Sequence, residues 1–574
     1  MIKRLAKCVR QYKKDLALTP FYVMLEVLMD ILVPLLMAYL IDHGIEKGNM
    51  NYIWKIGLLL VLATIISLVF GTLAGHYAAK ASAGFASNLR QDLYYRVQDF
   101  AFSNIDKYST ASIVTRLTTD VSNVQNSFQM IIRTAVRSPI LLIMSLVMVL
   151  SINQNIAIIF LGIVPFLGIG LYLVLVNAFP VFERVFKTYD KLNNVVQENL
   201  HGIRVVKSYV REDYEINKFQ TVSERIYQYF CKAEKIVALN NPLMQISMYS
   251  CILLISWFGA KMIVTGTMTT GELISIIAYS MQILMSLMML SMVFVMITIS
   301  KTSAERIVEV LEEVSDLDNR DHPIYDVENG DITFEDVNFS YAKDRTKLCL
   351  SDINLDIKSG ETIGIIGGTG SSKTSLVQLI PRLYDVTEGS VKVGGVDVRD
   401  YDIASLRNEV AMVLQKNVLF SGTIKDNLRW GSEEATDEEM IRVCKLAQAD
   451  DFIQSFPDKY DTYIEQGGTN VSGGQKQRLC IARALLKKPK ILILDDSTSA
   501  VDTKTDALIR KAFLEEIPNT TKIIIAQRIS SIEDADKIVV LEGGMINAIG
   551  THEELLASNP IYQEVYQSQK KGGE

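Results

Sequence analysis

The chain has 574 residues, a formal net charge of −7, 49% hydrophobic residues and 21% charged residues. This length exceeds what one hydrophobic core usually organises and predicts several domains. The negative charge, without any basic stripe, argues against a nucleic-acid-binding protein, because such proteins carry excess Lys and Arg to neutralise phosphates. The six cysteines are scattered and form no C-x-x-C pair, so the sequence predicts neither a zinc site nor a disulfide framework.

The N-terminal segment MIKRLAKCVRQYKK is basic and precedes an apolar stretch. This order resembles a secretory signal, but the apolar stretch is too long, contains Glu26 and Asp30, and lacks a small-residue cleavage site. We therefore expect an amphipathic helix on the inner membrane surface that leads into a retained membrane span.

The apolar residues are concentrated in six segments that are long enough to cross a bilayer, which takes about 20 residues. The segments cover residues 17–41, 52–79, 131–150, 156–179, 243–264 and 273–299. Three connections between them are short, whereas two are long, charged and poor in Gly and Pro, and are expected to be projecting helices. Lys and Arg gather in the two long connections, which predicts that these connections and both termini are cytoplasmic.

Two features of these segments are candidates for lining a water-filled cavity. Glu26 and Asp30 are four residues apart and share one helix face, and ionisable groups inside a membrane usually face the protein interior or such a cavity. They are interpreted either as a cation-attracting patch or, for Glu26, as a group near enough to the surface to be hydrated. Methionines recur at helical spacing in the sixth segment, and Met is common both on promiscuous binding surfaces and in ordinary helix packing. The candidate cavity residues are Glu26, Asp30, Met285, Met289 and Met292.

After residue 299 the pattern changes to a charged helix and then to the polar segment SDLDNRDHPIYDVENG, which is typical of a domain boundary. From residue 331 onward, short β-rich runs alternate with helical stretches, which predicts an α/β domain with a largely parallel sheet. The predicted organisation is a membrane domain over 1–310, a linker over 311–330 and an α/β domain over 331–574.

The segment TIGIIGGTGSSKTSLVQLI has the pattern of a strand, a glycine-rich loop and a helix. In a P-loop, backbone N–H groups surround the phosphates, the Lys reaches the β- and γ-phosphates, and the next hydroxyl binds Mg²⁺. These roles are predicted for residues 367–372, Lys373 and Thr374. The loop departs from G-x-x-x-x-G-K-[ST] because Ser372 stands where the last Gly belongs. A second apolar strand, KILILDD, contains Asp495, the kind of carboxylate that holds Mg²⁺.

Just before that strand, VSGGQKQR forms a glycine-rich turn that opens a helix. With this motif the sequence resembles the ATP-binding cassette (ABC) family, whose S-G-G-Q signature is more specific than a P-loop. The resemblance covers nearly the whole chain and implies a half-size type I exporter of multidrug or lipid-flippase type. It implies an α-helical membrane domain of six spans with long cytoplasmic extensions, fused to an α/β P-loop domain. Short transverse helices at the tips of both extensions would dock on the nucleotide domains.

The resemblance also implies roles for single residues. Gln415 would contact Mg²⁺ and the membrane domain, Asp502 would cross the dimer, and Tyr341 would stack on adenine. The implied cofactors are ATP and Mg²⁺. The implied ATP-binding residues are Tyr341, Gly367, Gly368, Thr369, Gly370, Ser371, Ser372, Lys373, Thr374, Ser375 and Gln415. The implied magnesium ligands are Thr374, Gln415 and Asp495, and the implied signature residues for a partner's ATP are Ser472, Gly473, Gly474 and Gln475.

Two further positions depart from the family pattern. The family has a Glu after the magnesium Asp, which polarises the attacking water, whereas this chain has Asp496. The family's switch His is replaced by Gln527. Together with Ser372, these changes affect the phosphate end of one site and predict a degenerate catalytic site. The chain is therefore expected to be the degenerate member of a heterodimer that gives its intact signature to the partner's competent site.

Other assignments stay open. The chain is also compatible with a homodimeric lipid or peptide exporter, or with a regulatory or channel-like cassette protein without transport of its own. An importer is disfavoured because nothing in the sequence indicates a dock for a binding protein. The expected partners are a second half-transporter, the lipid bilayer and an amphipathic small molecule, and the expected location is the cytoplasmic membrane. Amphipathic drugs, lipids and peptides are all compatible cargoes.

Overall fold

The computed structural model describes residues 1–497 and 499–571. The chain divides into two compact units. The first contains Met1–Asp99 and Ser109–Glu313, and the second contains Phe100–Tyr108 and Val314–Glu574. The short segment Phe100–Tyr108 therefore belongs with the C-terminal unit, although the chain on both sides of it belongs with the first.

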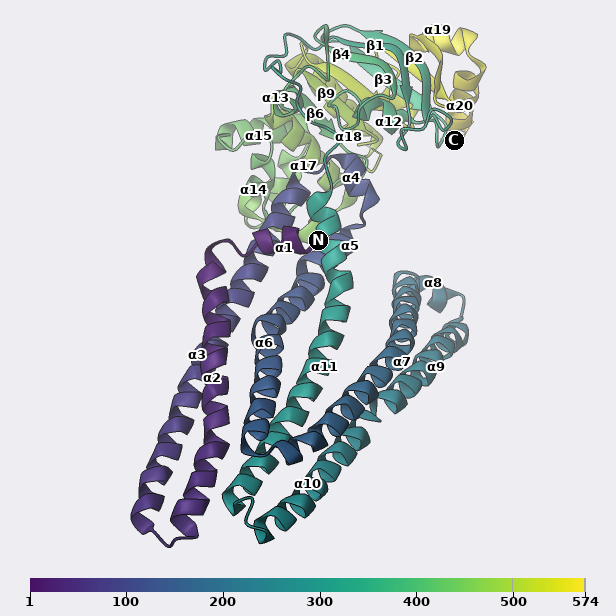
Figure 1. The fold of residues 1–574 in the computed structure, drawn as a ribbon. Coiled ribbons are helices and arrows are strands. Elements are labelled where there is room, and N and C mark those ends of the chain that lie inside the picture. The colour runs from purple at the N-terminus through teal and green to yellow at the C-terminus, as the bar shows by residue number, and fades with distance from the viewer. Residues whose placement is uncertain (498, 572–574) are drawn as a thin grey trace. The chain divides into compact units, whose positions relative to one another are not determined.

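The first unit is built from helices (Figure 1). Its α-helices are α1 (Ile2–Lys7), α2 (Lys13–Leu40), α3 (Met50–Gln98), α5 (Thr110–Thr115), α6 (Val121–Ile152), α7 (Gln154–His201), α8 (Ile203–Ser208), α9 (Glu212–Val237), α10 (Asn240–Val264) and α11 (Thr270–Glu312). Within the described part of the chain, six helical stretches are long and apolar enough to cross a membrane. The prediction of a membrane domain with six spans is thus confirmed.

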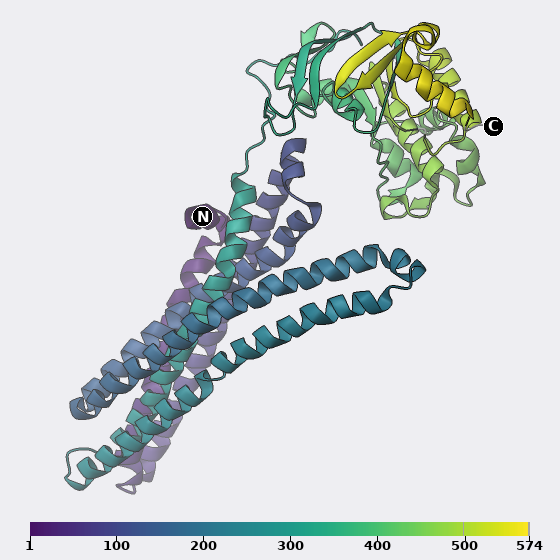
Figure 2. The same ribbon diagram turned by 90° about the vertical axis from the view of Figure 1, so that its right-hand side faces the viewer.

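Several of these helices are longer than a bilayer requires. The 49 residues of α3 extend over roughly 74 Å at 1.5 Å per residue, whereas a hydrocarbon core is about 30 Å thick. The C-terminal part of α3 carries Arg90, Asp92 and Arg96, so it is the part outside the hydrocarbon. Both views show α7 and α9 side by side, joined at their ends by α8 (Figures 1 and 2). The predicted helical extensions are therefore present.

The core of the first unit lies among α2, α6, α7, α10 and α11. Its largest buried side chains include Phe160, Ile255, Tyr279 and Ile283. Tyr279 donates a hydrogen bond of 2.7 Å to the carbonyl of Ile31, which satisfies its phenol inside the bundle. This contact ties α11 to α2.

The second unit contains two main sheets. The antiparallel sheet has the order β2-β1-β4-β5 and consists of β1 (Ile332–Phe339), β2 (Leu350–Ile357), β4 (Glu388–Val393) and β5 (Val396–Asp397). The larger sheet has the order β12-β11-β3-β10-β9-β6 and consists of β3 (Thr362–Gly367), β6 (Val410–Val413), β9 (Ile491–Asp495), β10 (Thr521–Ile525), β11 (Lys537–Glu542) and β12 (Met545–Gly550). All its strands except β12 are parallel, which confirms the predicted α/β domain.

The parallel strands are nearly continuous apolar runs because both faces of the sheet are covered. One face packs on the antiparallel sheet through residues such as Ile363 and Ile493, and the other packs on helices through residues such as Leu494 and Ile538. The α-helices of this unit are α4 (Phe102–Lys107), α12 (Lys373–Gln378), α13 (Ile403–Glu409), α14 (Ile424–Arg429), α15 (Asp437–Leu446), α16 (Asp450–Ser455), α17 (Gly473–Leu486), α18 (Thr503–Glu516), α19 (His552–Ser558) and α20 (Pro560–Lys571). A short pair of strands, β7 (Gly422–Thr423) and β8 (Tyr463–Ile464), lies apart from both sheets.

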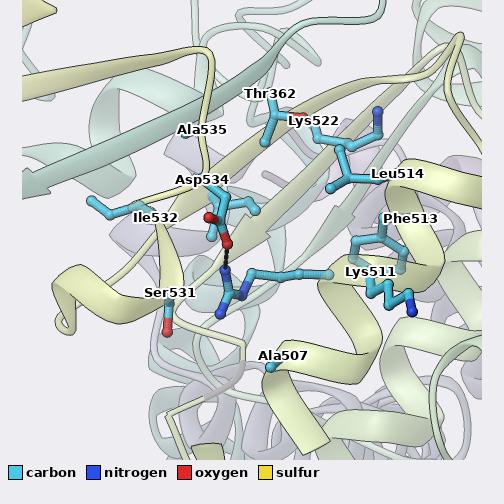
Figure 3. A pocket seen from close by; sticks show the side chains of 12 residues that line it. Thr362, Ala507, Lys511, Phe513, Leu514, Lys522, Ser531, Ile532, Asp534 and Ala535 are labelled. Atoms are coloured by element: carbon cyan, nitrogen blue, oxygen red, sulfur yellow. Dashed lines mark hydrogen bonds and ion pairs between the residues drawn. The ribbon is translucent and has the colours of Figure 1, made fainter. Parts of the chain in front are cut away.

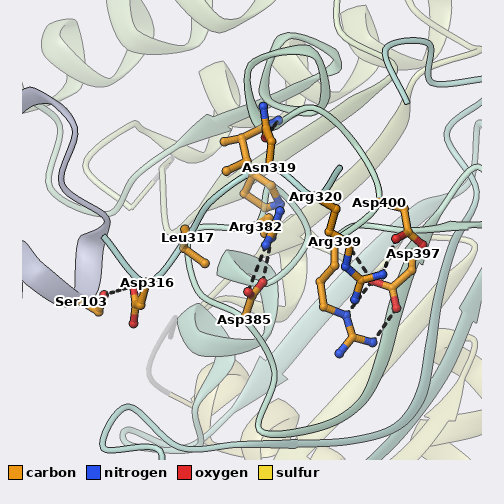
Figure 4. Close-up of polar contacts among 12 residues, drawn as sticks. Ser103, Asp316, Leu317, Asn319, Arg320, Arg382, Asp385, Asp397, Arg399 and Asp400 are labelled. Carbon is orange, nitrogen blue, oxygen red and sulfur yellow. Dashed lines mark hydrogen bonds and ion pairs between the residues drawn. The ribbon is translucent and has the colours of Figure 1, made fainter. Parts of the chain in front are cut away.

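The polar segment that follows α11 is held by charged and amide side chains (Figure 4). Arg320 pairs with Asp400, and Asn319 donates a hydrogen bond of 2.6 Å to Asp402. At the start of the same segment, Asp316 accepts a hydrogen bond of 2.6 Å from Ser103 of α4. The polar segment predicted as a linker is therefore fastened within the C-terminal unit, including to its helix α4.

Candidate functional site

The predicted nucleotide residues gather at one edge of the larger sheet. The P-loop follows β3, Gln527 follows β10, Asp496 follows β9 and Gln415 follows β6, and these four strands are consecutive neighbours. Because the strands are parallel, their carboxyl ends lie at the same edge, where α/β sheets bind ligands. The topology thus assembles residues that are far apart in the sequence.

The P-loop turns sharply between β3 and α12. Ser372 has a φ of +66°, in the left-handed region that non-glycine residues seldom occupy. A Gly at this position would hold the same conformation without that cost. Gly370 has a φ of +85°, and a Cβ added to it or to Gly368 would meet nothing within 4 Å, so this part of the loop lies open to a ligand. The departure at Ser372 therefore introduces strain rather than a change of shape.

Lys373 is the charged group of the loop. Its ammonium donates to the carbonyls of Gly367 and Gly368 at 2.8 and 2.9 Å, and to the hydroxyl of Ser371 at 3.2 Å. Burial lowers the pKa of Lys373, while the nearby Asp495 and Asp496 oppose that shift. This open loop and its lysine fit a phosphate. The charged phosphate oxygens would accept the hydrogen bonds that the Lys373 ammonium now donates to neutral oxygens.

Thr374 and Asp495 form an oxygen pair next to the loop. The Thr374 hydroxyl donates a hydrogen bond of 2.9 Å to the Asp495 carboxylate, which is 2% exposed. Burial raises the pKa of Asp495, and the Thr374 hydrogen bond opposes that shift. A hydroxyl and a carboxylate in contact are hard oxygen ligands of the kind that Mg²⁺ takes. Thr374 and Asp495, two of the three predicted ligands, therefore have the chemistry that the metal requires.

Asp496, Gln527 and Gln415 form one cluster. Gln527 Nε2 donates a hydrogen bond of 2.7 Å to Asp496 Oδ2, and Gln415 Nε2 lies 3.5 Å from the same oxygen. The backbone carbonyl of Gln527 in turn accepts a hydrogen bond of 2.7 Å from the side-chain amide of Gln569 in α20. The side-chain oxygen of Gln569 accepts a hydrogen bond of 2.9 Å from the backbone amide of Ile529. Gln569 could not be predicted from the sequence, because α20 lies far along the chain and has no motif.

Tyr341, the predicted adenine-stacking residue, lies beside the P-loop helix. Its hydroxyl is 2.9 Å from the Ser375 hydroxyl and donates to Gln378 at 3.3 Å, so α12 fixes the orientation of the ring. The residue is 45% exposed, which leaves ring surface free for a base. Its ring also meets the ring of Tyr384 edge-on, with 5.0 Å between centroids.

Tyr384 connects this aromatic cluster to α4. Its hydroxyl donates a hydrogen bond of 2.6 Å to Asp106, and the centroids of the Phe102 and Tyr384 rings are 6.1 Å apart. Burial and the Asp106 hydrogen bond both raise the pKa of Tyr384, so the phenol stays protonated and remains a donor. The sequence pointed to the region of α4 but not to Tyr384, since an aromatic in a loop after α12 is unremarkable until its neighbours are known.

The signature residues lie on another element. Ser472 caps α17 by accepting a hydrogen bond of 3.3 Å from the Gln475 amide, and the Gln475 side chain accepts one of 2.9 Å from the Ser472 amide. A Cβ on Gly474 would come within 2.8 Å of the Ala500 carbonyl, so the turn requires Gly there. Ser472 and Gly473 are exposed. Asp502 caps α18 by accepting a hydrogen bond of 3.0 Å from the Thr505 amide, which lowers the pKa of Asp502.

In the first unit, Glu26 and Asp30 lie together on α2, but they are accompanied by a cation. Arg137 of α6 contacts Asp30 at 2.8 Å and Glu26 at 3.4 Å. Ser67 donates a further hydrogen bond of 2.9 Å to Asp30, whereas Glu26 Oε2 is buried without a hydrogen-bond partner among the described residues. The sequence could not assign Arg137 to this pair, because the contact depends on how α6 packs against α2. Met285, Met289 and Met292 on α11 are 55%, 46% and 55% exposed.

Comparison with known proteins finds matches for both units. A model described as the ABC transporter transmembrane region matches residues 16–288, and one described as ABC transporter matches residues 350–499. An uncharacterized ABC transporter ATP-binding protein of Bacillus subtilis, YfiB, is 37% identical over 544 residues, which cover 95% of this chain and 94% of the relative. An ATP-dependent lipid A-core flippase of Desulfotalea psychrophila is 32% identical over 543 residues, which cover 93% of each chain.

Proposed function

Since the chain belongs to the ABC transporter family, we propose that it is one half of a heterodimeric exporter that moves amphipathic compounds out across the cytoplasmic membrane. Membership of the family implies an ATP-binding domain, ATPase-coupled transport and a multi-pass membrane protein that acts as a dimer. The heterodimer, the division of labour between its two sites and the cargo are the proposal. The observation that carries it is the contact between Asp496 and Gln527.

The binding steps follow from the groups in the site. The backbone amides of residues 367–372 and the Lys373 ammonium bind the phosphates, and Tyr341 holds the base. Thr374, Asp495 and Gln415 would hold Mg²⁺, which would supply positive charge to offset the negative charge of the phosphate oxygens. The signature residues Ser472–Gln475 present the amides at the start of α17 to the ATP of the partner, where a helix N-terminus favours an anion.

Hydrolysis at this chain's own site is slow in the proposed mechanism for two physical reasons. Asp496 is one methylene shorter than Glu, so its carboxylate is withdrawn by about 1 Å from the attacking water, and such a displacement can cost on the order of 100-fold in rate. Its Oδ2 also accepts a hydrogen bond from the Gln527 amide, which makes this oxygen a weaker acceptor for a proton from water. Gln527 cannot carry the positive charge that a His can. In the proposal, this site therefore keeps ATP bound while the partner's site repeatedly binds and hydrolyses ATP.

A partner chain is also supported by the tip of the α7–α9 hairpin. Around α8, Val205, Tyr209 and Val210 are 59%, 74% and 81% exposed, although apolar side chains at such a tip are costly to leave in water. The tip is the second region that resembles a docking helix of the family. In the proposed dimer it docks on the partner's nucleotide domain, whereas α4 remains with this chain's own.

The proposed cargo follows from the first unit. Two carboxylates against one guanidinium leave the cluster of Glu26, Asp30 and Arg137 with a formal excess of one negative charge. Exposed methionines on α11 offer adaptable apolar contacts. This combination favours cationic amphiphiles. In the proposed orientation the basic connections, both termini and the nucleotide domain face the cytoplasm.

Purification of the tagged chain from its native membrane tests the heterodimer. We expect a second ABC half in equal amount, with Glu and His at the positions that match Asp496 and Gln527. Inside-out vesicles containing the pair should accumulate a fluorescent cationic amphiphile when supplied with ATP. A chain that purifies only with copies of itself, or vesicles with ATPase activity but no flux, would contradict the proposal.

Lipid export is the second candidate, and the similarity to proteins named lipid A-core flippases favours it. Vesicles that carry a fluorescent lipid in one leaflet separate the two cargoes. ATP-dependent movement of the lipid, without accumulation of the soluble amphiphile, would establish the lipid candidate.

A further inference from the structure

A cavity of about 240 Å³ lies in the second unit, at the end of the larger sheet opposite the nucleotide site (Figure 3). Its walls come from α18, from the first residues of β3 and β10, and from the segment 531–535. The apolar part of the lining includes Phe513, Ile524, Ile532 and Ala535. A cavity of roughly 150 Å³ with such walls can bind benzene, so this one is large enough for a small organic molecule.

Lys522 is the anomaly in this lining. It is the second residue of β10, between Thr521 and Ile523, and it is only 2% exposed. Across residues 1–497 and 499–571, no hydrogen bond or ion pair reaches its ammonium. A buried charge without a partner is costly, and burial correspondingly lowers the pKa of Lys522. No described acid therefore forms a contact ion pair with this ammonium, and Asp536 acts on it only through space.

The other charged groups of the cavity already have partners. Arg510 pairs with Asp534 at 2.8 Å and with Asp506 at 3.4 Å, and Lys511 lies 3.8 Å from Glu515. Asp536, the acid that acts on Lys522 through space, accepts a hydrogen bond of 2.7 Å from the Thr362 amide. Among the described residues, Lys522 is therefore the lining cation that forms no contact ion pair, with Asp536 acting on it only through space.

We propose that this cavity is a binding site for a small monocarboxylate with an apolar body, whose carboxylate pairs with the Lys522 ammonium and whose apolar body packs on Phe513 and Ile532. A carboxylate supplies the contact ion pair that the ammonium lacks and accepts its hydrogen bonds. An apolar body of about the size of a phenyl ring displaces water from the apolar walls. A phosphate would fit the charge but leave those walls in contact with polar groups, and a sugar would bring polar groups to them without any charge.

The site is independent of the nucleotide residues but adjoins two elements that lead to them. α18 begins at the capping residue Asp502, and the segment 531–535 follows the loop of Gln527. An occupant would contact both elements. Its presence is measurable without any assumption about cargo or partner.

The test uses the full chain in lipid nanodiscs, with 4-fluorobenzoate as the probe and 4-fluorobenzyl alcohol as its neutral counterpart, both followed by fluorine NMR. We expect the carboxylate to bind at least about tenfold more tightly than the alcohol, a difference of about 1.4 kcal/mol. Lys522→Met keeps most of the side-chain volume and removes the charge, so it should abolish this preference. ATP binding by the same variant should be unchanged, which shows that the domain is folded.

Lys511→Met is the matched control, because Lys511 lines the same cavity but is exposed and paired. It should retain the preference for the carboxylate. Ala535→Leu fills the cavity without touching Lys522 and should remove binding of both probes. Equal binding of the two probes by the native chain, or equal losses in Lys522→Met and Lys511→Met, would overturn the proposal, since Lys522 would then be an uncharged wall residue or the attraction a general surface effect.

Discussion

Gln527 and Asp496 are 31 positions apart and are joined by a hydrogen bond of 2.7 Å at the carboxyl edge of the larger sheet. These are the two positions at which the resemblance to the ABC family implies a catalytic Glu and a switch His. The two substitutions therefore form one structural unit, in which each side chain satisfies the other. A unit of this kind should respond to mutation as a pair.

The double substitution Asp496→Glu with Gln527→His should restore hydrolysis at this site. Glu extends the carboxylate by one methylene, and His can carry a positive charge near the phosphate. With the partner's catalytic Glu replaced by Gln, phosphate release from the purified pair should rise by on the order of 10- to 100-fold. Asp496→Glu alone is the control and should give a smaller gain. No gain from the double substitution would show that the site is slow for another reason.

Asp496→Asn should lower the ATPase activity of the otherwise intact pair only modestly. The amide oxygen of Asn can still accept the hydrogen bond from Gln527, and little hydrolysis depends on this carboxylate. Glu→Gln at the partner's matching position should nearly abolish activity. If this chain alone hydrolyses ATP briskly and Asp496→Asn stops it, the heterodimer with a degenerate site is excluded.

Ser472→Arg should block the partner's site without affecting this chain's own P-loop. The side chain that caps α17 would be lost, and a large cation would stand where the signature amides are expected to meet the partner's ATP. Photolabelling with azido-ATP should still mark this chain, while steady-state hydrolysis by the pair falls to near background. Thr551→Arg, which alters an equivalent cap on α19, serves as the control for loss of a capping residue. Undiminished hydrolysis in Ser472→Arg would contradict the assignment.

The sequence was sufficient for contacts that follow from regular structure and insufficient for those that depend on packing. Residues after β3, β9, β10 and β6 were predictable as one site, because parallel strands place their ends together. Glu26 and Asp30 were predictable as neighbours from their spacing of four. Arg137 was not, because its approach to them depends on the packing of α6 against α2.

Two further contacts illustrate the same limit within the second unit. Tyr384 meets Asp106 across 278 positions, and Gln569 meets Gln527 across 42 positions. Neither belongs to a motif, and each becomes visible only when a helix packs on a loop. Long-range partners of motif residues thus remain the part that a single sequence leaves open.

Tyr384→Phe should leave ATP binding intact but weaken the coupling between the ATP site and α4. The substitution removes the hydroxyl that donates to Asp106 but keeps the ring against Tyr341, so ATP affinity should be retained. Stimulation of ATPase activity by cargo should fall, since a hydrogen bond to a charged group contributes about 1.5–3 kcal/mol. Tyr401→Phe is the matched control, because the Tyr401 hydroxyl donates to the Val393 carbonyl and is buried away from α4. Equal losses of stimulation in both variants would indicate general destabilisation.

Glu26→Gln should weaken export of cationic amphiphiles more than export of neutral ones. Glu26 is the more weakly held of the two acids, since it lies 3.4 Å from Arg137, whereas Asp30 lies 2.8 Å from Arg137 and also accepts a hydrogen bond from Ser67. Removing its charge brings the cluster from an excess of one negative charge to neutrality while leaving the pair of Asp30 and Arg137 in place. Initial rates of uptake into inside-out vesicles, measured for a cationic amphiphile and its neutral analogue, give the comparison. Glu46→Gln, in the turn between α2 and α3, controls for loss of an acid elsewhere in the unit. Equal reductions for both compounds, or none for either, would show that the cluster serves helix packing rather than selection of cargo.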